Sequence, residues 1–333
     1  MFYPLIILGA GASFDSVPEK HITGVIELRP PVSDSLLDIR FDGIIRRFPE
    51  VIDLTSSVMR DISPGTSLED SLLRIQKRAQ ENSERSVQLV MFEFYLQELF
   101  TKISSPAGGF GGQTASNYRA LIQEIKDGPK RAIVVNFNYD TLFEHDLNSG
   151  VSSTEHYIEG PIKVIKVHGS CDWRYIFRKD AAYEYVYRTE EDILRDNPLF
   201  LEGLRRKVNS VPHHIKGLEE RNGFWKFPAV AIPLPGKSEY ICPPHHRDLL
   251  KRELEKIDRI LILGWSARDR YIIDLIRNLE QPINLTVVSG SSNVIDGTFR
   301  EFSGRPNISR FHEAIGFSTY MASPECKTFF GTA

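Results

Sequence analysis

Short apolar segments recur along the chain, and most of them end in glycine or a small polar residue. Six runs have this form: Pro4–Gly9, Arg131–Phe137, Ile162–Gly169, Phe227–Leu234, Arg259–Gly264 and Asn284–Ser289. They lack the strict apolar–polar alternation of half-exposed strands, and are therefore typical of strands buried on both faces of a parallel sheet. Helical periodicity in Asp140–Leu147, His246–Ile257 and Arg270–Leu279 separates several of them. The pattern predicts an α/β fold with a Rossmann-like, doubly wound parallel sheet.

One long stretch, about residues 33–127, has no good strand run but several helical ones. Leu68–Arg78 follows the capping-box pattern Thr66-Ser-Leu-Glu69, which is typical of a helix start. Val87–Ile103 is apolar on nearly all sides, as in a helix surrounded by protein. We therefore expect a helical insertion after the first strand.

The whole chain, residues 1–333, is interpreted as one domain. The glycine-rich segment Pro106–Gly112 is interpreted as a flexible connector. A smaller excursion, about residues 178–221, is charged and is expected to consist of helix and loop. We find no internal repeat.

The composition excludes several classes of protein. The chain has 333 residues with 41% hydrophobic residues, enough for a sizeable core, and a formal net charge of −3. That charge provides no overall field for a phosphate backbone, so direct nucleic-acid binding is not expected. Three cysteines cannot form a disulfide framework, and no apolar run approaches the roughly 18 residues of a membrane-spanning helix. The first residues lack the basic leader of a signal peptide. We expect a soluble, cytoplasmic protein with no membrane contact.

Candidate chemistry gathers at the strand ends, where open α/β sheets bind ligands. The first run leads into Gly9-Ala-Gly-Ala-Ser13, a turn whose glycines allow close approach of a pyrophosphate and whose amides can donate to its oxygens. Phe14 stands where a third glycine would complete the dinucleotide fingerprint. No acidic residue ends a second strand about twenty residues later. An ordinary dehydrogenase is therefore disfavoured, and a tight turn without a ligand is the alternative.

Three further strand ends carry polar residues: Asn136-Phe-Asn138-Tyr-Asp140, Val167-His168-Gly-Ser170 and Gly264-Trp-Ser-Ala-Arg-Asp269. Each has a structural explanation taken alone. Asp140 could cap the helix that it opens, His168 could be a structural histidine, and Ser266 and Asp269 could begin a helix. Together they favour one site in the crevice where the strand ends converge.

In their order and spacing these segments resemble the sirtuin superfamily, and in particular its bacterial sirtuin-like branch found in antiphage defence. The matching pieces are Gly9–Ser13 with Arg29–Asp38 (RPPVSDSLLD), Asn136–Glu144 (NFNYDTLFE), Lys166–Trp173 (KVHGSCDW), Ile260–Asp269 (ILILGWSARD) and Gly316–Met321 (GFSTYM). They extend over about residues 5–320. The combination of NYD and VHGS between a GAG turn and a GxS turn is specific.

The resemblance implies an NAD site whose cofactor-binding residues are Gly9, Gly11, Ala12, Ser13, Gly264, Ser266 and Ser289. The residues after the first strand would hold the diphosphate. Gly264 and Ser266 would lie against the phosphates and distal ribose, and Ser289 nearer the adenosine.

The resemblance also implies three catalytic residues. His168 matches the family's catalytic histidine, Asn138 would hold the nicotinamide ribose or the attacking water, and Asp140 would face the nicotinamide carboxamide. A near-neutral imidazole can accept a proton from a ribose hydroxyl or from water. The chemistry needs no metal.

The chain departs from deacylating sirtuins, which carry two Cys-x-x-Cys pairs in a small zinc module, because it contains no such pair. The histidine pairs His213-His214 and His245-His246 are weak metal candidates, since adjacent side chains diverge and no carboxylate or thiol lies at ligand spacing. We expect no zinc module and no bound metal. A pocket that admits water rather than a peptide favours hydrolysis of NAD.

The sequence thus predicts an NAD glycohydrolase that cleaves NAD to nicotinamide and ADP-ribose, as the effector of a defence system that depletes NAD in abortive infection. Two alternatives remain: an NAD-dependent deacylase or ADP-ribosyltransferase, and a catalytically idle NAD- or ADP-ribose-binding regulatory subunit. Free NAD hydrolysis would poison the host. The resemblance therefore implies control by a homo-oligomer or a regulatory partner, such as a helicase-like ATPase or an Argonaute-type sensor.

Overall fold

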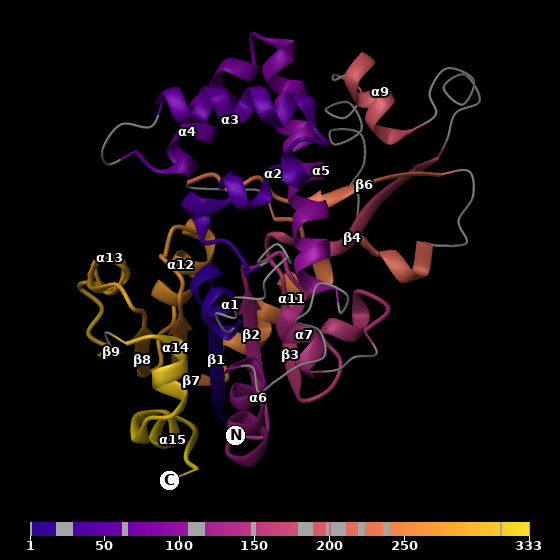
Figure 1. Ribbon diagram of the computed structural model, residues 1–333. Coiled ribbons are helices and arrows are strands. Elements are labelled where there is room, and N and C mark those ends of the chain that lie inside the picture. The colour runs from indigo at the N-terminus through magenta and orange to yellow at the C-terminus, as the bar shows by residue number, and fades with distance from the viewer. Residues whose placement is uncertain are drawn as a thin grey trace, which may run out of the picture.

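Six strands lie side by side and run parallel in the centre of the molecule, in the order β3-β2-β1-β7-β8-β9 (Figure 1). The structure is a computed structural model that describes residues 2–17, 29–61, 66–105, 117–147, 151–178, 189–197, 200, 211–218, 224–235, 240–313 and 315–332. The strands of the sheet are β1 (Tyr3–Leu8), β2 (Ala132–Asn136), β3 (Ile162–Ile165), β7 (Ile257–Leu263), β8 (Ile283–Val288) and β9 (Ile308–Glu313). The predicted fold class, a doubly wound parallel sheet with helices inserted after the first strand, is confirmed.

Alternate residues of β1 point to opposite faces, and both faces are covered by helices. Ile6 and Leu8 join one core with residues of the helix α6 (Asn117–Asp127), and Leu5 and Ile7 join another with residues of α12 (Arg270–Arg277). The first face carries α1 (Ala10–Ser16), α6 (Asn117–Asp127), α7 (Leu142–Leu147), α14 (Phe317–Met321) and α15 (Pro324–Phe330). The second carries α11 (Pro244–Leu254), α12 (Arg270–Arg277) and α13 (Ser292–Glu301). Burial on both faces explains why the strand runs are continuously apolar.

The order of the strands places a switch point beside β1. From β1 the chain forms β2 and β3 on one side, and later β7, β8 and β9 on the other. Leu8 at the end of β1 pairs with Asn136 of β2 and with Leu263 of β7. The three strands therefore end at the same level, and the segments that follow them open a crevice of the kind in which α/β sheets bind ligands.

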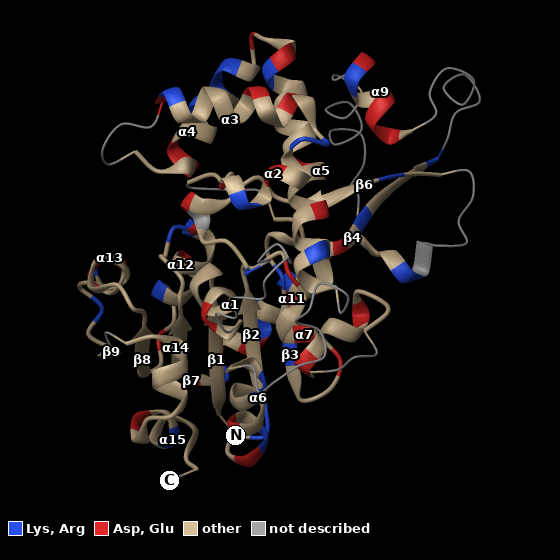
Figure 2. Cartoon of the chain, viewed as in Figure 1, with Lys and Arg blue, Asp and Glu red and all other residues tan. Residues whose placement is uncertain are grey.

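The helical module, residues 33–105, lies over this edge of the sheet (Figure 1). Its elements are η1 (Ser33–Ser35), η2 (Ile39–Phe41), α2 (Asp42–Ile45), α3 (Pro49–Asp61), α4 (Leu68–Ala79) and α5 (Ser83–Ser104). The helix α5 packs against α3 and α4 on one side and against the strands β4 (Gly169–Arg178) and β6 (Phe224–Val230) on the other. It is apolar nearly all round because protein surrounds it. The charged residues of α4 are separated along the helix, with Glu69 and Asp70 in its first turn and Lys77 and Arg78 in its last turn (Figure 2).

A second sheet is antiparallel and has the order β5-β4-β6. One predicted strand of the parallel sheet belongs to it instead. The run Phe227–Leu234 was expected in the parallel sheet, but it forms most of β6 (Phe224–Val230), which pairs with β4 (Gly169–Arg178). The run is apolar because β6 packs against α5, and such burial does not reveal the direction of a strand. The remaining strand is β5 (His213–His214), which lies in the excursion predicted as helix and loop.

The helix starts also differ in detail from the prediction. The capping box of α4 joins Ser67 and Asp70 rather than Thr66 and Glu69, one residue further along. Three short helices complete the described chain: η4 (Glu155–Tyr157), η5 (Ile215–Leu218) and α9 (Glu190–Asp196), the last two within the smaller excursion. The predicted connector Pro106–Gly112 lies outside the described residues. None of the described helices combines the length and the apolar character that crossing a membrane requires.

Candidate active site

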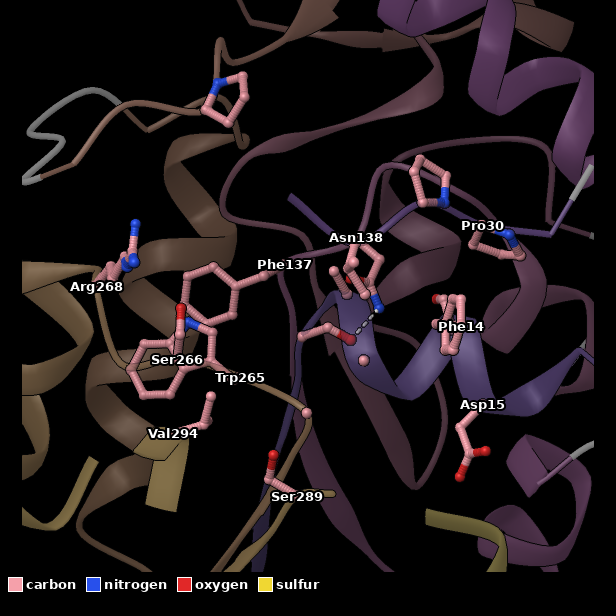
Figure 3. Close-up of a pocket in the computed structure, with 18 of the residues that line it drawn as sticks. Phe14, Asp15, Pro30, Phe137, Asn138, Trp265, Ser266, Arg268, Ser289 and Val294 are labelled. Carbon is pink, nitrogen blue, oxygen red and sulfur yellow. Dashed lines mark hydrogen bonds between the residues drawn. The ribbon is translucent and has the colours of Figure 1, made fainter. Parts of the chain in front are cut away.

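A pocket of about 650 Å³ opens at the switch point, between the strand ends and the helical module. Its volume is typical of small-molecule sites. Figure 3 shows Ser266, Ser289 and Arg268 on one side and Phe14 on the other, with Asn138 between them. The pocket brings together nine of the ten predicted site residues, namely Gly9, Gly11, Ser13, Asn138, Asp140, His168, Gly264, Ser266 and Ser289. Ala12 is the tenth; its side chain is fully buried in the core beneath α1 and does not line the pocket.

The glycines at the ends of β1 and β7 let two turns pack against each other. A β-carbon on Gly9 would lie 2.5 Å from the Cα of Trp265, and one on Gly264 would lie 2.5 Å from the nitrogen of Ala12. Gly264 also has a φ of +59°, which disfavours any other residue. The N–H groups of Gly9, Gly11 and Ala12 donate to Leu263 O, Gly264 O and Gly9 O at 3.0, 3.1 and 2.9 Å. The absence of side chains at Gly9 and Gly264 therefore allows the two turns to pack against each other.

Asn138 lies directly behind this turn and is held by it. Its side-chain nitrogen donates to Gly9 O at 3.0 Å and to the hydroxyl of Tyr118 at 3.3 Å. Both amide hydrogens are thus used, and the oxygen Oδ1 is the side-chain atom that can accept a donor from the pocket. The Ser13 hydroxyl lies 2.8 Å from that of Tyr118, whose pKa is raised well above its usual range by burial. These contacts fix Asn138 before any ligand binds.

A buried charge cluster supports the loop that carries Asn138 and Asp140. The fully buried Lys166 donates to the backbone oxygen of Asp140 and lies 3.5 Å from Glu144. The pKa values of the Asp140 and Glu144 carboxyls are raised, because the effect of burial exceeds the opposing effect of the neighbouring Lys166 ammonium. Asp140 also accepts the Leu142 N–H at 3.2 Å, so it caps α7 as well as lining the pocket.

Asn136 belongs to this cluster and does not line the pocket. Its side chain donates to Glu144 at 2.9 Å and accepts the N–H of Asn138 at 3.0 Å. Of the two asparagines in the NFNYD segment, only Asn138 lines the pocket. Asn136 instead secures the strand end.

His168 is held between an aromatic wall and a carboxylate. Its ring packs edge-on against Phe137 at 5.0 Å, and Phe137 stacks on Trp265 at 4.9 Å. Its Nε2 lies 3.0 Å from Oδ2 of Asp269, a residue whose other oxygen caps α12. Imidazole and carboxylate thus meet inside the pocket.

The helical module closes the pocket through an ion pair. Arg268 in the turn after β7 donates to Glu69 of α4, and lies 3.4 Å from the hydroxyl of Ser67. Among the described residues that line the pocket, Arg268 is the single Lys or Arg, against five carboxylates: Asp15, Asp34, Glu69, Asp140 and Asp269. Carboxylates therefore outnumber cations among these described residues, and Arg268, which already pairs with Glu69, is the one Lys or Arg among them.

Phe14 stands at the position where a dinucleotide fingerprint has its third glycine, and it packs against Arg29. The guanidinium of Arg29 lies 3.6 Å from the centre of its ring, and Arg29 Nε donates to Phe14 O at 2.8 Å. Phe14 and Pro30 line the pocket on the side opposite Ser266 (Figure 3).

The sequence prediction did not assign Asp269, Arg268, Glu69 or the Phe137–Trp265 stack to the site. A signal for Asp269 existed, because it ends the GWSARD segment that carries two predicted residues. Glu69 had none, since its contact with Arg268 joins positions 199 apart in the chain.

The histidine pairs and the cysteines have other partners or are buried. His214 lies 2.9 Å from Asp172, and His246 donates to Thr154 O at 2.9 Å. Within the described residues, no group of three or more His, Cys, Asp or Glu side chains could hold a metal ion. The cysteines are free and buried, and burial raises the pKa of each thiol to about 12.

Comparison with known proteins gave no matching family model and no matching curated protein. Among solved structures, the chain is similar to a Sir2 homologue variant bound to 2'-O-acetyl-ADP-ribose, with 15% identity over 99% of this chain and 92% of that one, at a TM-score of 0.44. It is also similar to Sir2 with a p53 peptide and NAD⁺ (13% identity, 99% and 94% covered, TM-score 0.42). A third is a Sir2 homologue–NAD complex (11% identity, 99% and 88% covered, TM-score 0.42). Because these TM-scores lie below 0.5, we base a function on the residues of the pocket.

Proposed function

We propose that this chain is a sirtuin-like NAD glycohydrolase that cleaves NAD to nicotinamide and ADP-ribose. One observation carries the proposal: Asn138 and His168 line the same pocket as the glycine turns after β1 and β7, at the switch point of a parallel sheet. A glycine-lined turn beside a strand end suits a dinucleotide, and an amide beside an imidazole suits activation of a hydroxyl or a water. The motif order that resembles sirtuins supports the same assignment.

In this proposal the catalytic residues are Asn138, His168 and Asp140. Loss of nicotinamide spreads positive charge over the ribose. A pocket with a surplus of carboxylates stabilises such charge, and Asp140 is the one buried beside Asn138. Asn138 Oδ1 accepts a hydrogen bond from a ribose hydroxyl or from the attacking water, since both of its amide hydrogens are already used. His168 takes up the proton that this hydroxyl or water releases.

The remaining site residues are proposed to hold the rest of NAD. The turn Gly9, Gly11, Ala12 and Ser13 would lie against the diphosphate. Because the N–H groups of Gly9, Gly11 and Ala12 already bond within the protein, the turn would contribute close approach, and Arg268 would balance the charge of the diphosphate. Gly264 and Ser266 would lie near the phosphates and distal ribose, and Ser289 near the adenosine.

The experiment that tests this function is NAD turnover by the purified chain, with nicotinamide and ADP-ribose both quantified. Equal release of the two products in the absence of any peptide supports hydrolysis. Tight NAD binding without release under any activating condition would instead favour a regulatory subunit. Zinc content is a second readout, because we propose that the activity needs no metal and persists in chelator.

A second candidate, an NAD-dependent deacylase or ADP-ribosyltransferase, is favoured by one feature of the pocket. Part of the pocket lining is apolar and includes Leu36, Phe100, Pro233 and Leu234. An apolar lining in the same pocket as His168 suits an acyl chain or an acceptor side chain. NAD loss that depends on an acylated peptide, or protein that carries ADP-ribose afterwards, would establish this candidate.

We further propose that the chain acts in bacterial antiphage defence, as an oligomer or with a regulatory partner. The support for the defence role is the resemblance of the motifs to the defence branch. The support for regulation is the link between Glu69 and Arg268, which ties the helical module to the turn that lines the pocket. A partner or a second copy that shifts the module would move Arg268 and alter entry to the pocket. Small misplacements at a reacting centre can cost about 10²-fold in rate. Expression of the chain alone should then be tolerated, and co-expression with its activator should deplete cellular NAD.

A further inference from the structure

The carboxylate of Asp269 faces the ring of His168 and is fixed by the protein on its other side. Oδ2 lies 3.0 Å from His168 Nε2, while Oδ1 accepts the N–H of Ile272 at 3.0 Å. The hydroxyl of Tyr240 lies 3.4 Å from the same Oδ1. The Asp269 side chain is 2% exposed. The orientation of the Asp269 side chain is therefore fixed by the N-terminus of α12 rather than by a ligand.

The backbone and the aromatic wall fix His168 from the opposite side. Its carbonyl oxygen accepts the N–H of Ala231 at 2.9 Å, and Phe137 packs edge-on against its ring. The next residue is Gly169 with a φ of +81°, where a β-carbon would collide with the backbone of Ala229. Both members of the pair are thus held in place by elements that lie far apart in the chain.

We propose that Asp269 is a positioning residue for His168, which holds the neutral ring in the Nε2–H form and stabilises the imidazolium once it forms. The inference rests on the proposed function. A carboxylate can only accept, so the proton between the two groups belongs to Nε2, and the lone pair of the neutral ring is then on Nδ1. In this proposal Nδ1, the nitrogen that does not face Asp269, is the proton acceptor of the reaction.

The proton transfer balances without any further reactant. The O–H bond of the ribose hydroxyl or of water breaks, its electron pair stays on oxygen, and an Nδ1–H bond forms. The ring becomes an imidazolium whose Nε2–H still faces the Asp269 carboxylate. Its positive charge is then paired at 3.0 Å inside the pocket. The proton later leaves to solvent, and the ring returns to the Nε2–H form.

Four ionisable residues near the pair in the described part of the chain keep one charge state near neutrality: Tyr240, Tyr271, Cys242 and Arg268. Burial is the main cause that raises the pKa of Tyr240 and of Tyr271, and the Asp269 carboxylate contributes in both. Burial raises the pKa of the Cys242 thiol, which acts on both tyrosines, to about 12. The pKa of Arg268 is raised, chiefly by Glu69.

The first test needs no turnover. In ¹⁵N–¹H spectra of histidine-labelled protein, the His168 signals are identified by their absence in His168→Ala, and they report which nitrogen carries the proton. We expect Nε2–H in the native chain. In Asp269→Asn, whose side chain can still cap α12, we expect the imidazolium to lose its proton about 1–3 pH units lower. An Nδ1–H form in the native chain, or an unchanged titration in Asp269→Asn, would overturn the proposal.

The second test is kinetic and uses the same variants. Because the protonated ring cannot accept a proton, the acid limb of kcat/KM follows the imidazolium and should move to lower pH in Asp269→Asn. At neutral pH kcat should fall about 10²–10⁴-fold, since Asn favours the wrong ring form. Asp38→Asn is the matched control, because Asp38 also caps a helix but lies outside the pocket. It should change neither readout.

The two tests separate the failure of this inference from the failure of the proposed function. If the spectra show the Nε2–H form and the expected shift in Asp269→Asn, but no condition yields nicotinamide, the proposed glycohydrolase activity is wrong and the positioning of His168 by Asp269 stands. If NAD is hydrolysed and Asp269→Asn keeps the native acid limb and kcat, the positioning role is wrong and the function stands.

Discussion

The backbone N–H of Gly11 donates to the carbonyl oxygen of Gly264 at 3.1 Å, and this bond joins the turn after β1 to the turn after β7. Those two turns are 253 positions apart in the chain, and the pocket forms where they meet. The close approach depends on the missing side chains, because a β-carbon on Gly11 would lie 3.0 Å from the Cα of Gly264. The geometry of the pocket therefore depends on glycine at both turns.

Gly9→Ala should damage the pocket and the fold together. Its β-carbon would collide with the backbone of the turn after β7, which cannot move away as a flexible side chain could. Overpacking of this kind costs about 1–3 kcal/mol. Thermal unfolding should show a lower Tm, and NAD binding by calorimetry should weaken. Gly290→Ala is the matched control, because Gly290 also lines the pocket and a β-carbon there meets nothing within 4 Å. A stable, fully binding Gly9→Ala protein would contradict the role of this contact.

His168→Ala should abolish nicotinamide release and leave the fold intact. The ring is partly exposed to the pocket, and its loss removes an edge contact with Phe137 and the contact with Asp269, whose other oxygen keeps its bond to Ile272. General acid–base groups contribute about 10²–10⁴-fold, and the rate should fall by that factor. Circular dichroism and Tm check the fold, and nicotinamide release is the readout. Activity within a few-fold of the native chain would refute the assignment of His168 as the base.

Asn138→Ala and Asn136→Ala should fail in different ways. Asn138→Ala should lose turnover and keep measurable NAD binding, because most proposed contacts lie elsewhere on NAD. Asn136→Ala should lose stability by about 1–3 kcal/mol, since it leaves the buried Glu144 without its amide donor. Denaturant unfolding and NAD calorimetry on both variants separate the two effects. The assignment would be reversed if Asn136→Ala were stable and inactive while Asn138→Ala stayed active.

The fold and part of the site follow from the sequence for a physical reason. The strand runs of β1, β2, β7 and β8 are apolar on both faces, and parallel strands bring their polar ends to one edge. This places Gly9, Asn138 and Gly264 together without any knowledge of side-chain positions. The edge strand β9 was missed because Ser309 through His312 are exposed, so it carries no apolar run.

What could not be predicted depends on contacts through space. His168 and Asp269 lie 101 positions apart, and no periodicity in the chain records that they meet. The same holds for Glu69, whose partner Arg268 belongs to a different part of the fold. The N-cap of α4 is Ser67, one residue after the predicted Thr66. The local pattern fits both residues and therefore does not distinguish them.

The stability of the protein should fall in mild acid, and His246 should account for part of the loss. Burial lowers the pKa of this ring from 6.5 to about 4, so the folded chain keeps it neutral while the unfolded chain takes up a proton. Above pH 6.5 the ring is neutral in both states and does not lower the free energy of unfolding. As the pH falls towards 4, proton uptake by the unfolded chain lowers the free energy of unfolding by about 3 kcal/mol in all. Urea unfolding between pH 4 and pH 8 measures this. His246→Gln should flatten the dependence and the exposed His312→Gln should not; equal slopes in both variants would exclude His246 as the cause.

The most direct test of the glycohydrolase is the stoichiometry of NAD cleavage by the purified chain, alone and with the product of its genomic neighbour, with His168→Ala as the control. We predict one nicotinamide and one ADP-ribose per NAD consumed, a low rate for the isolated chain, a large gain with the activator, and no release from His168→Ala under either condition. Full activity of the isolated chain without further gain would overturn only the proposed regulation. Release that is equal in the native chain and in His168→Ala, or no release in any condition, would contradict the glycohydrolase itself.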